Sequence, residues 1–90
     1  MNFEWAEIKA ASNLIKHKVS FEEASTVFAD DLSFTGRDPD HSLGELRYVI
    51  FGVSAANRIL VVSHTERGGI IRIISARPAT RAERKIYEKG

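Results

Sequence analysis

The sequence has no cysteine, one tryptophan, two prolines and no long apolar run. Without thiols the chain can form no disulfide, thiolate metal site or cysteine nucleophile. No apolar run approaches the roughly 18 residues that a membrane span requires, and no basic segment leads into an apolar one as in a secretory signal. We therefore expect a cytoplasmic protein without membrane contact, and its length indicates a single domain over residues 1–90.

Basic and acidic residues are unevenly distributed, although the net charge is only +1. Residues 1–45 carry four basic and nine acidic side chains, whereas residues 46–90 carry nine basic and three acidic ones. Seven of those nine are arginine, whose planar guanidinium binds phosphate oxygens in pairs. This excess favours a polyanionic ligand. The alternative is an acidic layer that only balances a basic layer within one fold.

Two helices are predicted in the first third of the chain, after a brief strand or anchor at residues 3–5. Apolar residues at helical spacing between positions 6 and 17 predict a helix with one buried stripe and a solvent-exposed opposite face. Ser20 begins a second helix, which Glu23 supports through a capping box and which ends near residues 30–31. The predicted stripe consists of Ile8, Ala11, Leu14 and Ile15.

Three strands and a last helix are predicted in the second half. The segment 33–43 is rich in Gly, Pro, Asp and Ser without any period, so we expect a loop. Gly68-Gly69 closes a hairpin, and Thr80 with Glu83 begins a final helix that reaches about Glu88. This order predicts an α+β fold: two N-terminal helices packed on a mainly antiparallel β-sheet of three to four strands, with a short C-terminal helix. The strands are Leu46–Val53, Arg58–Thr65 and Ile70–Arg77.

Polar side chains within the strands are the candidate site residues. One helical layer covers one face of a sheet, so polar residues on the other face are open to a ligand. His64 has an ordinary pKa near 6.5, which suits proton transfer, and an inert buried histidine is the alternative. His17 and His41 are weaker candidates, and no histidine pair has metal-ligand spacing, so we predict neither metal nor cofactor. The strand candidates are Arg47, His64, Arg72 and Arg77.

The register of the last hairpin decides which arginine lies beside His64, and the sequence leaves it open. A two-residue turn at Gly68-Gly69 places His64 opposite Ile73 and leaves His64 and Arg77 on one face. A loop of odd length instead puts His64 and Arg72 on one face.

Three stretches of the chain resemble the BrnT toxin family. The first stretch is N-terminal and comprises Phe3-Glu4-Trp5, Lys9-Ala10, Asn13, Lys16-His17 and residues 19–24. The second is residues 61–67. The third is residues 71–77, and it continues through Ala79 and Glu83-Arg84 to Tyr87. Glu45 and Arg47 also fit. The chain departs from the family at Ala6, where an aspartate usually stands that could cap the first helix, and at Lys18, where the family often has glycine.

The resemblance implies a RelE-like ribonuclease fold and a toxin of a type II toxin–antitoxin pair. Such an endoribonuclease, of the mRNA interferase type, cleaves RNA and inhibits translation. It further implies a BrnA-type antitoxin with a ribbon-helix-helix module, so that the chain meets DNA only indirectly through that partner.

The residues and the resemblance together lead to a hypothesis of metal-independent cleavage, in which a ribose 2′-hydroxyl attacks the adjacent phosphate. His64 and Tyr87 are the proton-transfer candidates, and Arg72 and Arg77 would neutralise the phosphoryl oxygens. The alternative is a non-catalytic module that docks an antitoxin and acts in transcriptional autoregulation. Direct DNA binding is disfavoured because no basic recognition helix is present. Flanking phosphates would be held by Lys16, Arg47, Arg67 and Arg84.

Overall fold

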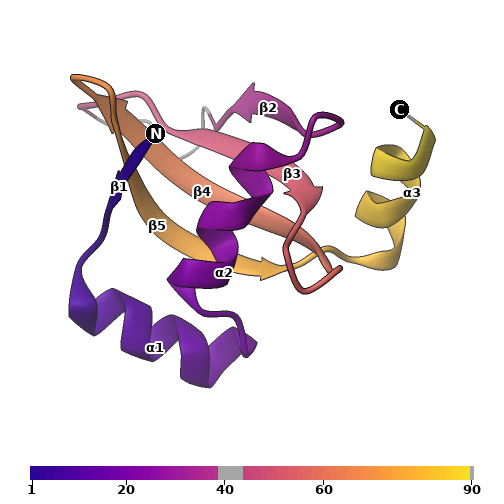
Figure 1. Ribbon diagram of the computed structural model, residues 1–90, viewed down its shortest axis with the longest axis horizontal. Coiled ribbons are helices and arrows are strands. Elements are labelled where there is room, and N and C mark those ends of the chain that lie inside the picture. Colours follow the sequence, from indigo (N-terminus) through magenta and orange to yellow (C-terminus); the bar gives the residue numbers. More distant parts are fainter. Residues whose placement is uncertain (39–43, 90) are drawn as a thin grey trace.

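The computed structural model describes residues 1–38 and 44–89, and shows one five-stranded sheet in the order β1-β5-β4-β3-β2 (Figure 1). The elements are β1 (Asn2–Glu4), α1 (Glu7–His17), α2 (Phe21–Ser25), the 3₁₀-helix η1 (Thr26–Ala29), β2 (Phe34–Arg37), β3 (Tyr48–Val53), β4 (Ile59–Arg67), β5 (Ile70–Pro78) and α3 (Arg81–Lys89). The predicted α+β class is confirmed. No helix within the described residues is long and apolar enough to cross a membrane.

The predicted count of three to four strands is too low, and the sheet is mixed. The brief strand expected at the N-terminus is β1, which pairs parallel with β5. Strand β2 lies within the segment expected to be a loop, and it pairs antiparallel with β3 at the sheet edge. All four β2 residues are exposed, so the segment lacks the alternation of apolar and polar residues that predicts a half-buried strand.

The hydrophobic core lies between the helical layer and one face of the sheet. Strand β3 approaches η1 so closely that an added Cβ at Gly52 would lie 3.1 Å from the Val27 carbonyl oxygen, which explains a glycine inside a strand. The core residues are Val19, Phe21, Ala24 and Val27 from the helical side and Ile50, Leu60, Val62, Ile73 and Ala76 from the sheet.

Helix α1 has nearly the predicted bounds, but the opposite face is buried. Ile8 and Ile15 of the predicted core stripe are 84% and 74% exposed, and Leu14 is 49% exposed. The buried residue is Asn13, at 6% exposure, which lies outside the predicted stripe. The apolar period correctly predicted a helix, and it was wrong about which side packs on the protein.

Asn13 is buried because its side chain satisfies the backbone of β5. Its amide nitrogen donates to the carbonyl oxygens of Val19 at 2.9 Å and Ala76 at 2.8 Å. Its amide oxygen accepts the Ala76 N–H at 3.0 Å. Asn13 thus occupies the place of a neighbouring strand beyond the end of β1, and a buried amide with its bonds made is stable.

The ends of the N-terminal helices follow their residue types. Ala6, at the N-cap of α1, makes no side-chain hydrogen bond, and Lys18 at its C-cap is left-handed with φ of 60°. The Ser20 hydroxyl accepts the Glu23 N–H at 3.0 Å, so the predicted cap of α2 is confirmed. The Glu23 carboxylate, expected to complete the box, instead binds the Arg58 guanidinium at 2.5 and 3.0 Å.

The β4–β5 hairpin has a two-residue turn. Gly68 and Gly69 have φ of +56° and +81°, values that glycine adopts without strain. Arg67 consequently pairs with Ile70 and His64 with Ile73, so the first of the two registers is confirmed.

A β-bulge in β5 separates His64 from Arg77. Ser63 pairs with Ser75 while His64 pairs with Ile73, so Ile74 is an extra residue in β5. One extra residue reverses the faces of the residues beyond it. The expectation that His64 and Arg77 share a face is therefore wrong.

Candidate active site

The sheet face turned away from α1 and α2 carries a groove of about 520 Å³, which we call the open-face groove. Its floor comes from β3, β4 and β5, and its walls come from β2 and the start of α3. A groove of this volume is in the range that accommodates a small ligand or one nucleotide. The floor residues are Val49, Phe51, Val61, Ser63, Ser75 and Arg77, and the walls are residues 34–38 and Glu83.

Arg77 and Glu83 form a bidentate ion pair in this groove. The two terminal nitrogens of Arg77 donate to the two oxygens of Glu83 at 2.7 and 2.9 Å. The hydrogen bonds from Arg77 are the main cause that lowers the pKa of Glu83 to about 2. Glu83 also accepts the Thr80 N–H at 2.8 Å and donates its own N–H to the Thr80 hydroxyl at 3.2 Å, so the predicted capping box of α3 is confirmed.

An aromatic wall lies beside this pair. The rings of Phe34 and Phe51 are stacked with centroids 4.9 Å apart, and the ring of Tyr87 lies 6.5 Å from that of Phe34. The Tyr87 hydroxyl donates to the Asp30 carboxylate, and this hydrogen bond raises the pKa of Tyr87 to about 12. Tyr87 therefore fixes α3 to the segment after η1, and it contacts the groove only through the ring of Phe34.

His64 lies on the other face of the sheet, inside the core. It is 4% exposed, and its ring packs 4.9 Å from Phe28 and 5.8 Å from Tyr48. Burial lowers the pKa of His64, so the ring is neutral at pH 7. The structure gives His64 no contact with the open-face groove, and its role in proton transfer stays a prediction.

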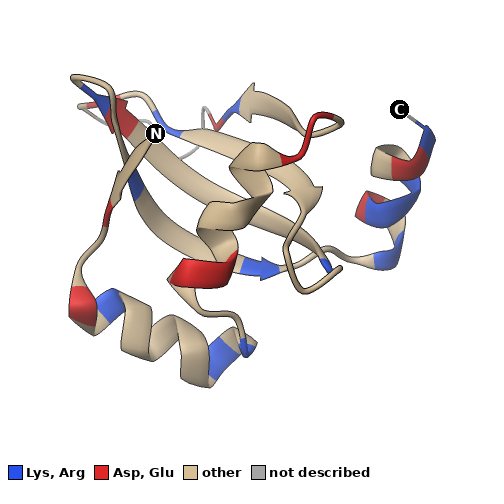
Figure 2. Cartoon of the chain, in the orientation of Figure 1, with Lys and Arg blue, Asp and Glu red and all other residues tan. Residues whose placement is uncertain are grey.

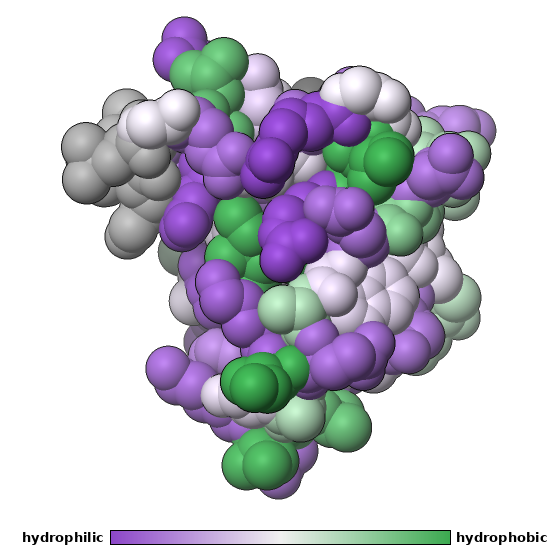
Figure 3. Space-filling model, turned by 90° about the vertical axis from the view of Figure 1, so that its left-hand side faces the viewer, coloured by the Kyte–Doolittle hydropathy of each residue, from purple (hydrophilic) through white to green (hydrophobic). Residues whose placement is uncertain are grey.

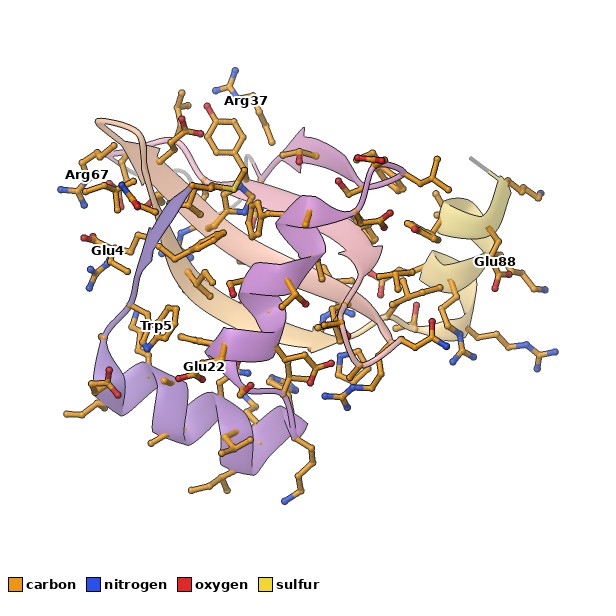
Figure 4. All side chains as sticks on the ribbon, in the orientation of Figure 1. Glu4, Trp5, Glu22, Arg37, Arg67 and Glu88 are labelled. Atoms are coloured by element: carbon orange, nitrogen blue, oxygen red, sulfur yellow. The ribbon has the colours of Figure 1, made fainter. Side chains whose placement is uncertain are left out.

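The other predicted cations do not converge on the groove. Arg72 points away from the helices and binds Glu4 at 3.0 Å, and Arg67 binds Glu45 at 3.3 Å at the hairpin end. Figure 4 shows Arg67 on the opposite side of the molecule from Glu88 of α3. Arg47 precedes β3, Arg84 is exposed on α3 and Lys16 is exposed on α1. Their contacts with RNA stay predictions, and His41 lies outside the described residues.

Ion pairs within the fold balance much of the excess of basic residues in the second half of the chain. This agrees with the alternative interpretation, in which acidic and basic layers balance each other within one fold. Carboxylates pair with at least four of the seven arginines in the second half of the chain. Figure 2 shows acidic and basic segments on both the helices and the strands. Among these four arginines, Arg77 is the one that lines the groove. The described parts of the chain contain no cluster of three or more histidine, aspartate or glutamate side chains placed to hold a metal ion.

Sequence reasoning missed Glu83 as a site residue, because it identified this residue only as a helix cap. The signal was present: the capping box from Thr80 to Glu83 begins three residues after Arg77, and it turns the Glu83 carboxylate back toward the strand end. Ser63 and Ser75, which face each other in the groove floor, carried no signal because serine is common in exposed strand positions.

Comparison with known proteins decides the family. A family model described as the ribonuclease toxin BrnT of type II toxin–antitoxin systems matches residues 5–83. The chain belongs to this family. The predicted resemblance to BrnT is thus confirmed. The chain is a toxin of a type II toxin–antitoxin system, and its family is described as one of ribonuclease toxins.

A solved structure supports the BrnT fold. The crystal structure of the Brucella abortus ribonuclease toxin BrnT aligns with a TM-score of 0.66 and 21% sequence identity. The alignment covers 90% of this chain and 99% of that chain. None of the curated proteins matches this sequence.

Proposed function

We propose that this BrnT toxin is a metal-independent endoribonuclease that cleaves mRNA in the open-face groove and thereby inhibits translation. The observation that supports this site is the bidentate pair of Arg77 with Glu83. A carboxylate and a phosphate present similar pairs of oxygens to an arginine. The Glu83 carboxylate therefore marks where a phosphate of RNA would bind Arg77.

In the proposed reaction the ribose 2′-oxygen attacks the adjacent phosphorus and the bond to the 5′-oxygen breaks. The products are a 2′,3′-cyclic phosphate and a 5′-hydroxyl end. Arg77 would neutralise the charge that develops on the phosphoryl oxygens, where a fixed cation contributes most to the rate. Arg72, on the same side of the sheet, is proposed to assist at a neighbouring phosphate.

Two proton transfers complete the proposed reaction. A phosphate that displaces Glu83 from Arg77 removes the hydrogen bonds that hold the pKa of Glu83 near 2. The freed carboxylate becomes more basic and can accept the 2′-hydroxyl proton. The leaving 5′-oxygen takes up a proton, for which Tyr87, whose ring lies 6.5 Å from that of Phe34 in the groove wall, is the proposed donor.

The decisive experiment compares purified variants on a single-stranded RNA in the presence of EDTA. We expect Arg77→Ala to lower the cleavage rate about 10²–10³-fold, because it removes the cation from the floor of the groove. Arg81→Ala is the matched control, since this arginine is exposed on α3 and does not line the groove.

An Arg77→Ala protein that cleaves at the wild-type rate would show that the site lies elsewhere. Cleavage that EDTA abolishes and Mg²⁺ restores would contradict the metal-independent reaction. Products with 5′-phosphate ends would contradict attack by the 2′-hydroxyl.

The proposed neutralising partner is a BrnA-type antitoxin with a ribbon-helix-helix module, through which the complex would bind DNA. Induced expression of the toxin alone should arrest growth, and co-expression of the antitoxin should restore it. Harmless expression of the toxin alone, together with tight complex formation, would instead identify a non-catalytic docking module.

A further inference from the structure

Helix α1 exposes an apolar face that the fold itself does not use. Ile8, Ala11 and Ile15 follow one another at i, i+3 and i+7, so they form one line along the helix, which we call the α1 stripe. The two isoleucines are 84% and 74% exposed, and Figure 3 shows apolar side chains at the lower end of the molecule, over α1. Contiguous apolar surface of this kind marks interaction sites in soluble proteins.

The attachment of α1 to the protein does not involve the stripe. Asn13 and Ala10 face the protein, and Asn13 makes three hydrogen bonds there. At 100° per residue, Asn13 lies roughly 150° around the helix from Ile8 and Ile15. The stripe therefore adds nothing to the packing of this chain, and it is available to another molecule.

Basic residues border the stripe on one side. Lys9 and Lys16 are exposed, and as i and i+7 they lie on the same flank of α1. This flank borders a groove of about 340 Å³ between α1 and β5, which we call the α1–β5 groove. Ile74 of the β-bulge is among the residues that line it. An apolar stripe, an isoleucine in a groove and two lysines are thus contiguous.

We propose that the α1 stripe and the α1–β5 groove dock an acidic amphipathic helix of the neutralising antitoxin. The apolar side of that helix would cover Ile8 and Ile15, as in other complexes where a helix binds through residues at i, i+3 and i+7. Its carboxylates would pair with Lys9 and Lys16. The identity of the partner rests on the proposed antitoxin partnership, and the surface itself does not depend on the ribonuclease reaction.

Charge and side-chain chemistry argue against two other occupants. In a two-fold antiparallel pair of α1 helices, Lys9 of one copy would lie beside Lys16 of the other, and like charges repel. RNA is recognised by hydrogen bonds to phosphates and by rings that stack on bases, and the aliphatic side chains of the stripe offer neither.

The test measures the affinity of the purified toxin for its cognate BrnA-type antitoxin, by calorimetry, and the inhibition of RNA cleavage by that antitoxin. We expect Ile15→Glu to weaken binding at least ~100-fold, because a buried apolar anchor is replaced by a charge that repels an acidic helix. Lys9→Glu should weaken binding about tenfold and less at high salt. The matched control is Leu32→Glu, at a residue that is 77% exposed and borders α3 residues instead of α1.

Ile15→Glu should cleave RNA at the wild-type rate and escape the antitoxin, since Ile15 does not line the open-face groove. Equal affinities of Ile15→Glu and Leu32→Glu would overturn the proposal. A Lys9→Glu protein that loses RNA affinity and keeps antitoxin affinity would assign the surface to RNA. A wild-type dimer that Ile15→Glu converts to a monomer would assign the surface to a second copy of the chain. Either result would overturn the proposal. If the wild-type chain cleaves no RNA, the proposed function fails while the affinities still decide the docking site.

Discussion

At the scale of single residues, Asn13 connects parts of the chain that are far apart in sequence. Its partner Ala76 lies 63 positions away, and both backbone groups of Ala76 bond to the Asn13 amide. The same amide nitrogen also bonds the Val19 carbonyl just after α1. One side chain thereby fixes the helix, the turn after it and the edge of β5.

Replacing Asn13 by alanine should lower the free energy of unfolding by about 2–4 kcal/mol, because it leaves a buried N–H and two carbonyl groups without partners. Urea unfolding at pH 7 measures the change. Ser12→Ala, at an exposed neighbour, is the control and should lie within about 0.5 kcal/mol of wild type. An Asn13→Ala protein as stable as that control would mean that α1 is held by other contacts.

His64 shows what a single sequence leaves undecided at this scale. Its residue type suits proton transfer and also suits a neutral ring in the core, and alternation along β4 does not decide between these roles. The deciding contacts are with Phe28 and Tyr48, from elements far away in the chain. Burial among aromatic rings favours a packing role for His64, whereas Arg77 was predicted correctly as a residue on a face that the helices leave open.

At the scale of elements, predictions succeeded where local sequence determines local geometry. Gly68-Gly69 supplied two residues that adopt positive φ, and the hairpin turn followed. Thr80 with Glu83 supplied a complete capping box, and α3 begins there. The bulge at Ile74 had no such signal, because an isoleucine within a β-rich run looks the same whether it is paired or extra. Strand β2 was missed because tertiary pairing with β3 makes it a strand.

The C-cap of α1 offers a test of element stability. Lys18 has φ of 60°, a conformation that costs a side chain with a Cβ about 1 kcal/mol relative to glycine. We expect Lys18→Gly to raise the free energy of unfolding by about 0.5–1 kcal/mol, measured by thermal or urea denaturation. The control is Lys16→Gly, inside the last turn of α1, which should lower it by about 1 kcal/mol. Destabilisation by both substitutions would contradict a strained C-cap.

At the scale of the whole molecule, ion pairs join the acidic first half of the chain to the basic second half. Glu23 on α2 holds Arg58 before β4, and Glu4 on β1 holds Arg72 on β5. The hydrogen bonds from Arg58 lower the pKa of Glu23, and the hydrogen bond from Tyr87 lowers that of Asp30. The division of charge seen in the sequence is therefore part of how the two halves hold together.

Stability should fall steadily as the pH is lowered from 7 to 3. Burial lowers the pKa of His64, so protonation of the unfolded chain opposes folding below about pH 6.5. Glu83, with its folded pKa near 2, contributes stability that is complete above about pH 4.5 and is lost as the pH falls toward 2. Urea unfolding at pH 7, 5.5, 4 and 3 measures this profile.

Glu83→Gln separates the two contributions to that profile. Its stability deficit relative to wild type should be largest at pH 7 and should shrink between pH 4 and pH 3, as the pH falls from the ordinary pKa of a glutamate toward the folded pKa of about 2. A stability deficit that is constant over the whole pH range would show that the glutamine disturbs packing instead of removing the charge. A wild-type stability that stays flat from pH 7 to 3 would contradict the contributions of both His64 and Glu83.

The parallel pairing of β1 with β5 determines the order in which a growing chain can mature. Asn2 leaves the ribosome early, yet its partner Ile70 follows only after the other strands have been made. Arg77 and Glu83 are synthesised later still, so a nascent chain passes through most of its translation without the open-face groove. Long-range pairing of this kind also slows folding, so the open-face groove and the α1–β5 groove both form late, once β5 has been made and paired.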